Sequence, residues 1–93
     1  NQHVLAADIY YVESLDHYCI FHTASGKLRK LMTLAAAQDM LVAEGFLRCS
    51  NSHLVNPRHV SGISRNSVTV HGVEIPVSRR KHKEFMEEIT RYF

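Results

Sequence analysis

The sequence predicts a mostly β domain with two helices. Short stretches rich in β-branched and aromatic residues are separated by turn residues, which is typical of strands. Two other segments, one in the middle and one closing the chain, repeat their apolar residues at helical spacing. The chain has 93 residues, of which 45% are hydrophobic and 22% charged, and this suits one globular domain with a single core. Because there is no internal repeat or linker, residues 1–93 are expected to form that one domain.

The first third of the chain predicts three strands joined by tight turns. The strands are expected over residues 9–14, 17–23 and 27–32, with turns at 15–16 and 24–26. In the second strand, Cys19 and Phe21 share one face and Tyr18 lies on the other. That strand is therefore expected to be buried on at least one side.

A short helix is predicted next, over residues 34–44. Thr33 can cap its first turn, and Gly45 is placed to end it. Its apolar stripe consists of Leu34, Ala37, Met40 and Leu41. Residues 46–50 are then expected to form a short strand. The segment 51–58 that follows is polar, and Pro57 prevents it from continuing as a helix.

The last third predicts three more strands and a closing helix. The strands are expected over residues 59–63, 67–71 and 73–77, with turns at 64–66 and 71–72. The closing helix begins at Arg79, with Ser78 as its N-cap, and runs toward the chain end. Its apolar residues at helical spacing are Phe85, Met86, Ile89, Tyr92 and Phe93. The expected architecture is thus a set of small antiparallel sheets with a middle helix and a C-terminal helix.

The first turn of the closing helix has an unusual charge order. It carries Arg79, Arg80 and Lys81, although acidic residues are the usual choice there because the helix dipole is positive at its N-terminus. The acids of this helix begin only at Glu84. Basic side chains at a helix N-terminus favour an anion such as phosphate. The alternative is a solvated basic turn without a function.

Positive charge is concentrated in the middle of the chain. Residues 45–83 hold seven Lys and Arg residues against one acid, Glu74, although the whole chain has a net charge of only +2. Strand-like apolar residues separate these cations, so the segment is expected to be a folded basic face and not a disordered tail. Such a face favours a polyanionic partner.

Several functional classes are disfavoured by the sequence. No apolar run approaches the roughly 20 residues that cross a bilayer and no signal-peptide pattern opens the chain, so the cytoplasm is the expected compartment. Cys19 and Cys49 lack CxxC spacing and are expected to be reduced thiols. No catalytic triad or paired-carboxylate pattern is present, so no enzyme activity and no cofactor are expected. A zinc site that combines these cysteines with His22 and His53 is disfavoured, because residues 19 and 22 fall on opposite faces of one strand.

Several motifs along the chain together point to a family. They are Asp-Ile-Tyr-Tyr-Val-Glu-Ser at residues 8–14, His17-Tyr18, Gly-Phe-Leu-Arg-Cys-Ser-Asn-Ser-His-Leu-Val-Asn at residues 45–56, and Ile-Pro-Val-Ser-Arg-Arg at residues 75–80. Their order resembles the LytTR family, the DNA-binding output domains of bacterial response regulators, from Ala7 onward. The resemblance implies an elongated arrangement of small β-sheets that binds DNA through loops. It also implies a longer regulator with a receiver domain upstream.

The resemblance implies two groups of DNA contacts. The residues expected to contact bases, on loops that enter the major groove, are His17, Asn51 and Arg79. Those expected to lie along the DNA backbone are Arg48, Ser52, Arg80 and Lys81. Arg and Asn side chains suit the edges of guanine and adenine, so the residue types agree with this assignment. We therefore expect sequence-specific binding of double-stranded DNA, by two copies as a dimer on repeated half-sites, because one small domain buries limited DNA surface.

Some of these residues also have a structural interpretation. Arg48 is also explained as the solvent-facing member of a strand alternation, and His17 as a polar strand end. Asn56 is typical of turn formers, whose side chains bond nearby backbone amides. Many relatives carry His at the position of Ser50. The shorter Ser hydroxyl reaches less far, so we assign Ser50 no base contact. Pro57 also departs from the family pattern, in which an apolar residue is commoner. The remaining histidines are expected to be structural or solvated: His3, His22, His53, His59, His71 and His82.

An RNA-binding or protein-interaction β-module is the alternative function. RNA-binding sheets expose aromatic side chains for stacking on bases. The aromatic residues available for this are Tyr10, Tyr11, Tyr18 and Phe21. Their alternation with aliphatic residues favours a place in the core, so DNA binding is the preferred interpretation.

Overall fold

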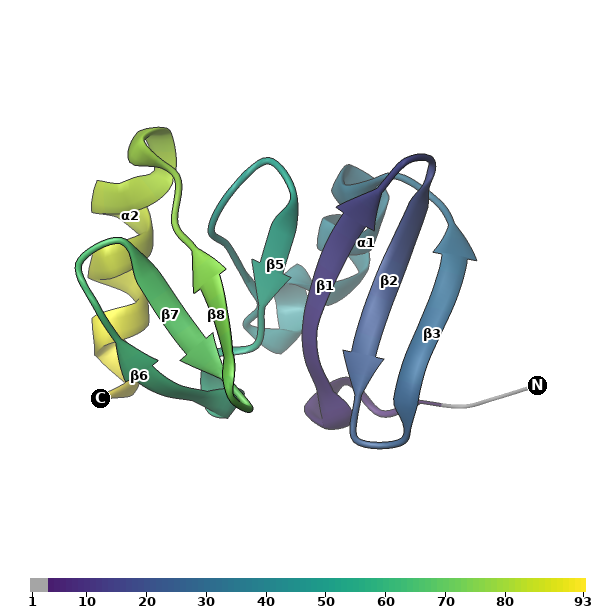
Figure 1. The fold of residues 1–93 in the computed structure, drawn as a ribbon, viewed down its shortest axis with the longest axis horizontal. Helices are drawn as coiled ribbons and strands as arrows, with labels where there is room; N and C mark the ends of the chain where they lie inside the picture. Colours follow the sequence, from purple (N-terminus) through teal and green to yellow (C-terminus); the bar gives the residue numbers. More distant parts are fainter. Residues whose placement is uncertain (1–3) are drawn as a thin grey trace.

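The fold consists of two antiparallel β-sheets and two α-helices arranged along one long axis (Figure 1). The computed structural model describes residues 4–93 and measures 38 × 24 × 23 Å. The strands are β1 Ile9–Leu15, β2 Tyr18–Thr23, β3 Gly26–Leu31, β4 Leu47–Arg48, β5 His53–Val55, β6 Val60–Ile63, β7 Ser67–Val70 and β8 Val73–Pro76. The helices are α1 Leu34–Leu41 and α2 Arg79–Ile89, with 3-10 turns η1 Ala6–Asp8, η2 Val42–Glu44, η3 Pro57–His59 and η4 Thr90–Tyr92. The predicted class, mostly β with two helices, is confirmed.

The larger sheet contains a strand that the sequence did not reveal. Its order is β3-β2-β1-β5-β4, so β5 lies between β1 and β4, and β6-β7-β8 form the smaller sheet. The sequence predicts no strand within the polar segment 51–58, whereas the structure has β5 at its centre. Three residues are too few to show an alternation of polar and apolar side chains. The strand forms because β1 offers its hydrogen-bonding edge, with Val12 opposite Leu54.

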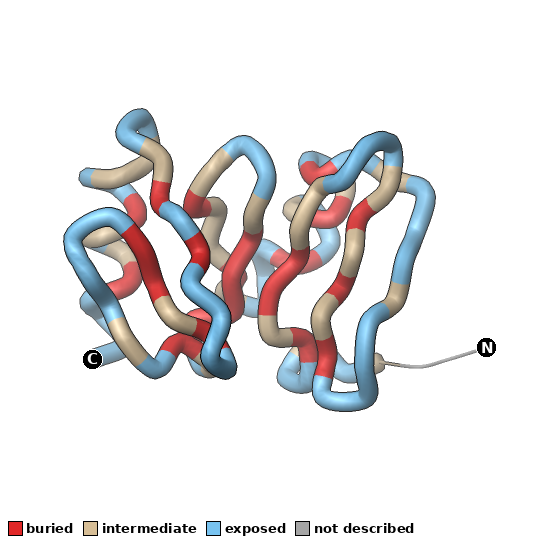
Figure 2. The backbone as a smooth tube through the Cα atoms, viewed as in Figure 1, coloured by how far each residue is buried: buried red, intermediate tan, exposed pale blue. Residues whose placement is uncertain are grey.

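The buried residues of the larger sheet belong to two hydrophobic clusters. Buried positions lie along its central strands, whereas the turns between β1, β2 and β3 are exposed (Figure 2). One hydrophobic cluster joins this sheet to α1, and the other joins it to the smaller sheet and α2. Neighbouring residues of the central strands face opposite ways. Val12 and Leu54 belong to the α1 cluster, and Tyr11 and Val55 belong to the α2 cluster. The expectation of a single core is thus wrong, because β1 and β5 divide the buried side chains into two clusters.

Both helices begin where the sequence predicts and end earlier. Thr33 Oγ1 accepts a hydrogen bond from the Ala36 amide at 3.1 Å, and Ser78 Oγ accepts one from the Lys81 amide at 3.3 Å, so both N-caps are confirmed. The α-helices α1 and α2 end at Leu41 and Ile89, and the chain continues after each helix as a tighter 3-10 turn. Gly45, with φ of 88°, ends the first of these turns as predicted.

The other predicted strands are present, with ends shifted by one or two residues. The predicted strand at 46–50 keeps only Leu47–Arg48. The first strand extends through Leu15, so the first turn is Asp16–His17 and not 15–16. Asp16 adopts the left-handed conformation of this turn, with φ of 57°, which an Asp side chain tolerates better than most. His17 therefore lies at the tip of a turn and not in a strand.

Asn56 fastens β5 to the start of the chain. Its side chain is 1% exposed, and Nδ2 donates to the Ile9 carbonyl at 3.0 Å and to the Ala6 carbonyl at 3.4 Å. Its Oδ1 accepts from the Arg58 amide at 3.2 Å and thereby caps η3, where Pro57 is the first residue. The structural interpretation of Asn56 as a turn former is confirmed.

Candidate nucleic-acid interface

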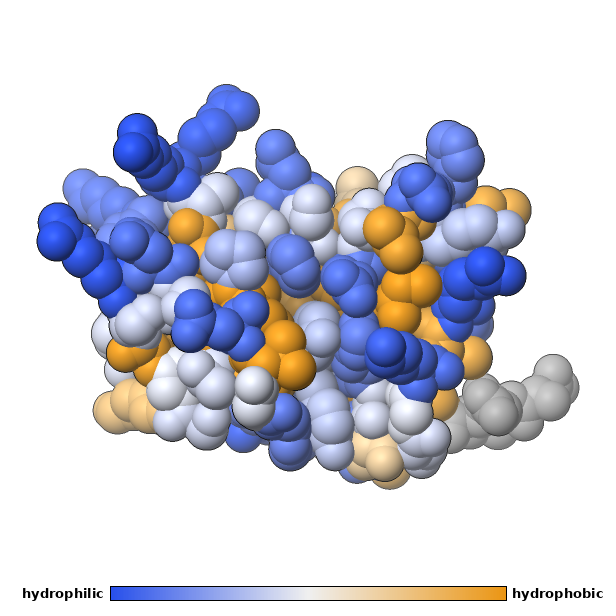
Figure 3. Space-filling view, in the orientation of Figure 1, coloured by the Kyte–Doolittle hydropathy of each residue, from blue (hydrophilic) through white to orange (hydrophobic). Residues whose placement is uncertain are grey.

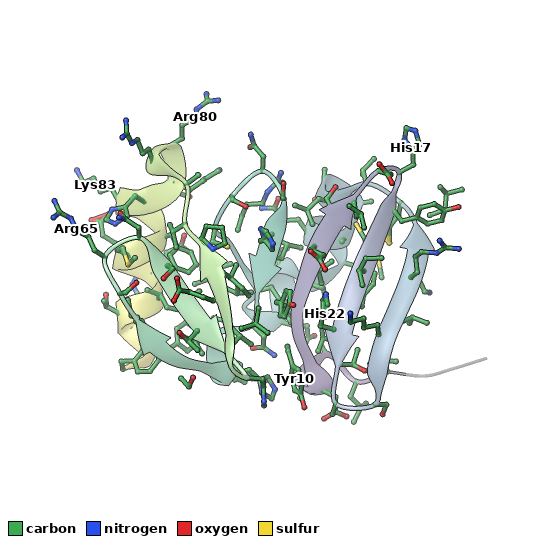
Figure 4. All side chains as sticks on the ribbon, in the orientation of Figure 1. Tyr10, His17, His22, Arg65, Arg80 and Lys83 are labelled. Carbon is green, nitrogen blue, oxygen red and sulfur yellow. The ribbon has the colours of Figure 1, made fainter. Side chains whose placement is uncertain are left out.

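The three loops that carry the predicted DNA contacts lie along one edge of the molecule, the upper edge in Figure 1. They are the β1–β2 turn with His17, the β4–β5 loop with Asn51, and the start of α2 with Arg79. All three of these residues are exposed. His17 and Arg80 project from opposite ends of this edge, whereas Tyr10 lies at the lower edge (Figure 4). We call the surface formed by the three loops the loop edge.

Two open depressions lie between these loops, and Asn51 borders both. The first, of about 490 Å³, is lined by the β1–β2 turn, the β4–β5 loop and the start of α1, and its lining includes His17 and Arg48. The second, of about 380 Å³, reaches from Asn51 to the start of α2, and its lining includes Arg80 and Lys81. Asn51 therefore connects the three loops into one surface.

Two of the predicted contact residues, Ser52 and Arg79, line neither depression. Both are exposed, and Arg79 directly follows the Ser78 cap as the first residue of α2. One acid, Glu84, borders the second depression beside Lys81. The structure thus brings five of the seven predicted residues together around the depressions and leaves the other two on the neighbouring surface.

Arg48 organises the β4–β5 loop. Its Nε donates to the Ser50 carbonyl at 2.8 Å, and its Nη2 donates to the Asn51 carbonyl at 3.3 Å. Its Nη1 donates to Oε1 of Gln38 on α1 at 2.9 Å. The backbone that carries Asn51 is therefore held against α1 through one guanidinium. Three of the guanidinium's five N–H groups are used in these bonds, and the other two make no hydrogen bond within the described residues.

Ser50 and His53 stabilise the same loop from within. Ser50 Oγ accepts a hydrogen bond from the Ser52 amide at 3.0 Å and lies 3.1 Å from His53 Nδ1. Burial lowers the pKa of His53, and the neighbouring Glu13 carboxylate opposes this with a smaller effect. The side chain of Ser50 therefore has partners inside the loop.

The chain matches the family model of the LytTr DNA-binding domain over residues 2–90. It belongs to this family. A solved structure with a similar fold is the LytTr DNA-binding domain of a protein from Bacillus cereus, assigned as a methyl-accepting/DNA response regulator. The two chains share 19% sequence identity and superpose with a TM-score of 0.80, over 94% of this chain and 84% of the other. No protein of curated function matches the chain.

The Lys and Arg side chains of this LytTr domain have no carboxylate partner within residues 4–93. Within residues 4–93 the one ion pair joins His22 to Glu13, with 2.7 Å between Nε2 and Oε1. No Lys or Arg nitrogen in this range lies within 4.0 Å of a carboxylate oxygen. Hydrophilic side chains stand out from both ends of the loop edge (Figure 3). Cations presented in this way are available to phosphate groups.

Five histidines make contacts within the described residues, namely His22, His53, His59, His71 and His82. His59 Nε2 donates to the Ala7 carbonyl at 2.6 Å, and its Nδ1 lies 2.9 Å from His71 Nε2. His82 Nε2 donates to the Arg65 carbonyl at 2.6 Å. Among residues 4–93, no three His, Cys, Asp or Glu side chains are grouped to hold a metal ion. His3 lies outside the described residues.

Both cysteines of the LytTr domain are buried, and neither is part of a disulfide in the structure. Cys19 belongs to the α1 cluster and Cys49 to the α2 cluster, so the two thiols lie on opposite faces of the larger sheet. Burial raises the pKa of Cys49 to about 12 and also raises that of Cys19. Across residues 4–93, no helix has the length and hydrophobicity to cross a membrane.

Sequence reasoning missed the part that α1 plays at the loop edge. Gln38 anchors Arg48 from a helix ten residues earlier in the chain, and the first residues of α1 line the first depression. A Gln on the polar side of a helix is common, so nothing in the sequence marks Gln38 as special. Only the packing of α1 against β1 and β5 shows where its N-terminal end lies.

Proposed function

We propose that this LytTr domain binds double-stranded DNA in a sequence-specific manner through the loop edge and acts as the output domain of a transcriptional response regulator. The observation that carries the proposal is that Asn51 borders both depressions, so His17, Asn51 and the basic start of α2 share one surface. Membership of a DNA-binding family supports duplex DNA as the polyanion.

The size of the domain suits a duplex that runs along the loop edge. The longest dimension of 38 Å corresponds to about 11 base pairs at about 3.4 Å per base pair. The major groove is about 12 Å wide and admits a narrow element such as the β1–β2 hairpin tip. In this arrangement the loops enter the major groove and the flanking cations face the phosphates.

The proposed base contacts follow from the hydrogen-bonding groups of three exposed side chains. The amide of Asn51 can donate and accept together, as an adenine edge requires, and the guanidinium of Arg79 can donate twice to guanine. His17 offers one donor and one acceptor from the tip of its turn. These three residues are therefore proposed to select the sequence.

The proposed backbone contacts are made by residues whose groups suit phosphate. Arg80 and Lys81 supply charge at the start of α2, Ser52 supplies a hydroxyl, and Arg48 supplies its two remaining N–H groups. One domain of this size covers about one helical turn, so we propose that two copies bind repeated half-sites as a dimer on DNA. We propose further that a receiver domain lies upstream in a longer regulator, as the resemblance to the family implies.

The first test is a selection of binding sites from random duplexes at two salt concentrations. We expect one recurring sequence, and an affinity that falls with salt with a log–log slope near about −4.5 if about five phosphates are contacted. Recovery of random sequences at both salt concentrations would contradict specific readout.

The second test separates base contacts from backbone contacts with three Arg→Ala variants. Arg79→Ala should lose about 1–3 kcal/mol of discrimination at one base position. Arg80→Ala should weaken binding to all duplexes alike. Arg58→Ala is the matched control, because Arg58 is exposed on η3 beside His59, which packs against Tyr10 at the lower edge. If Arg79→Ala lowers specific and random-site binding equally, its assignment to a base is wrong.

The aromatic residues favour duplex DNA over single-stranded RNA as the ligand. Tyr11 and Phe21 are buried. Tyr18 is half-buried and has the Arg29 guanidinium 4.3 Å from its ring centroid, and Tyr10 stacks on His71 at 3.6 Å. Each of these rings is either buried or has another side chain on one of its faces, which suits it less to the base stacking that RNA-binding sheets use. A single-stranded RNA that competes as well as a duplex of equal length would favour the RNA-binding alternative.

A further inference from the structure

We propose that Arg65 and Lys83 form a second phosphate-binding patch, which contacts the DNA backbone beyond the segment that the loop edge covers. This inference rests on the proposed function and extends it, since neither residue belongs to the loops proposed to read or flank the bases. Arg65 lies in the β6–β7 turn and Lys83 on α2, and both project from the α2 end of the molecule (Figure 4). Arg80 stands above them at the end of the loop edge.

The turn that carries Arg65 is held firmly against α2. Its own ends are joined by a bond from the Ser64 amide to the Ser67 carbonyl at 2.9 Å. The Val77 amide donates to the Asn66 carbonyl at 2.9 Å, which ties the turn to the end of β8. His82 Nε2 donates to the Arg65 carbonyl at 2.6 Å, which ties it to α2. Arg65 is thus presented from an ordered backbone next to Lys83.

The two cations are available to an external anion. Both residues are exposed. Within residues 4–93 neither side chain has a carboxylate within 4.0 Å, although α2 carries Glu84 immediately after Lys83. The Arg65 guanidinium, unlike that of Arg48, donates no hydrogen bond to the described part of the protein. A group with five donors and no internal partner suits the oxygens of a phosphate.

The patch is continuous with the loop edge. Arg80 and Lys83 are three residues apart on α2 and therefore lie on the same face of the helix. The His82 bond places Arg65 beside that face. Cations therefore lead from the second depression around the α2 end of the domain. A duplex longer than the 38 Å molecule continues past this end, where its phosphates meet the patch.

The test compares two duplexes, one limited to the selected site and one extended by about one helical turn on each side. Wild-type domain should bind the longer duplex more tightly. The double variant Arg65→Ala/Lys83→Ala should lose that gain and bind the short duplex like wild type. Because two phosphates add about 1.8 to the salt slope, the ratio of wild-type to variant affinity on the long duplex should be about 12-fold larger at 50 mM than at 200 mM salt.

Two control variants isolate the patch from net charge and from the loop edge. Arg65→Lys/Lys83→Arg keeps both charges and should keep the gain from the longer duplex. Arg58→Ala/Arg91→Ala removes two exposed charges elsewhere and should also keep it. If Arg65→Ala/Lys83→Ala weakens binding to both duplexes equally, or to neither, the proposed patch is wrong. The proposed role of the loop edge would not be affected, because Arg79→Ala tests it separately. A wild-type domain that binds neither duplex would overturn the proposed function as well.

Discussion

Replacing Arg48 by Lys separates two roles that the structure allows for this residue. Lys keeps the positive charge that a phosphate contact needs. It cannot reproduce a planar fork that donates to Ser50, Asn51 and Gln38 at 2.8, 3.3 and 2.9 Å. If Arg48 acts chiefly by holding the β4–β5 loop, the conservative substitution should be nearly as harmful as Arg48→Ala.

The size of the effect follows from the bonds that are lost. A single ammonium can replace at most one of the two short bonds well, so about two of the three hydrogen bonds disappear. At about 0.5–1.5 kcal/mol for each bond, the ordered loop loses about 1–3 kcal/mol. Binding must then supply this ordering free energy, which weakens DNA affinity by roughly 5–150-fold, since about 1.4 kcal/mol corresponds to tenfold.

Fluorescence anisotropy would measure this loss of DNA affinity. It would use the selected duplex and a second duplex altered at the base pair that we propose Asn51 contacts. Arg48→Lys should weaken binding to the selected duplex and narrow the difference between the two duplexes. Gln38→Ala removes one of the three bonds without changing the charge and should give a smaller effect in the same direction. Near wild-type affinity of Arg48→Lys, with full discrimination, would show that Arg48 acts through its charge alone.

Three further predictions concern stability and reactivity. Asn56→Asp turns the donor that faces the Ile9 carbonyl into an acceptor and should lower the free energy of unfolding by about 3 kcal/mol at pH 7, seen as a fall in Tm of roughly 12–24 °C; an unchanged Tm would contradict the bonding. Because burial lowers the pKa of His53, the unfolded chain binds its proton first on acidification, so stability should fall as the pH drops below about 6.5, the ordinary value for His. His53→Gln should flatten that slope in urea titrations at several pH values, and an identical slope would assign the pH dependence to other groups. Cys19 and Cys49 should react with iodoacetamide far more slowly in the folded domain than in urea, because burial raises both pKa values; equal rates by mass spectrometry would contradict the buried thiols.

Local features of the chain predict local features of the fold. The caps Thr33 and Ser78 depend on a side chain and an amide three residues later, so short sequence windows contain the whole interaction. The alternation of Cys19 and Phe21 with Tyr18 likewise fixes which face of β2 is buried. Such elements are predicted correctly because their causes lie within a few residues.

Features that depend on distant partners are not predicted. Strand β5 forms on an edge that β1 supplies, and no pattern within residues 53–55 signals it. Arg48 shows the same limit at the candidate site, because its hydrogen bond to Gln38 depends on how α1 packs. The resemblance to the family predicts which side chains contact DNA, and that stays a prediction, whereas the hydrogen bonds that hold the β4–β5 loop are seen only in the structure.

The separation in sequence between β1 and its partner β5 has a consequence for the order of folding. The hairpins of β1, β2 and β3 join neighbours in sequence, so they can form within microseconds of collapse. Pairing β1 with β5 instead closes a long loop of chain, whose entropy must be lost before the contacts compensate. We therefore expect β5 to join the larger sheet after the β1–β2–β3 hairpins have formed, and a ribosome-bound chain that ends before residue 53 to have those hairpins without the β5 strand beside β1.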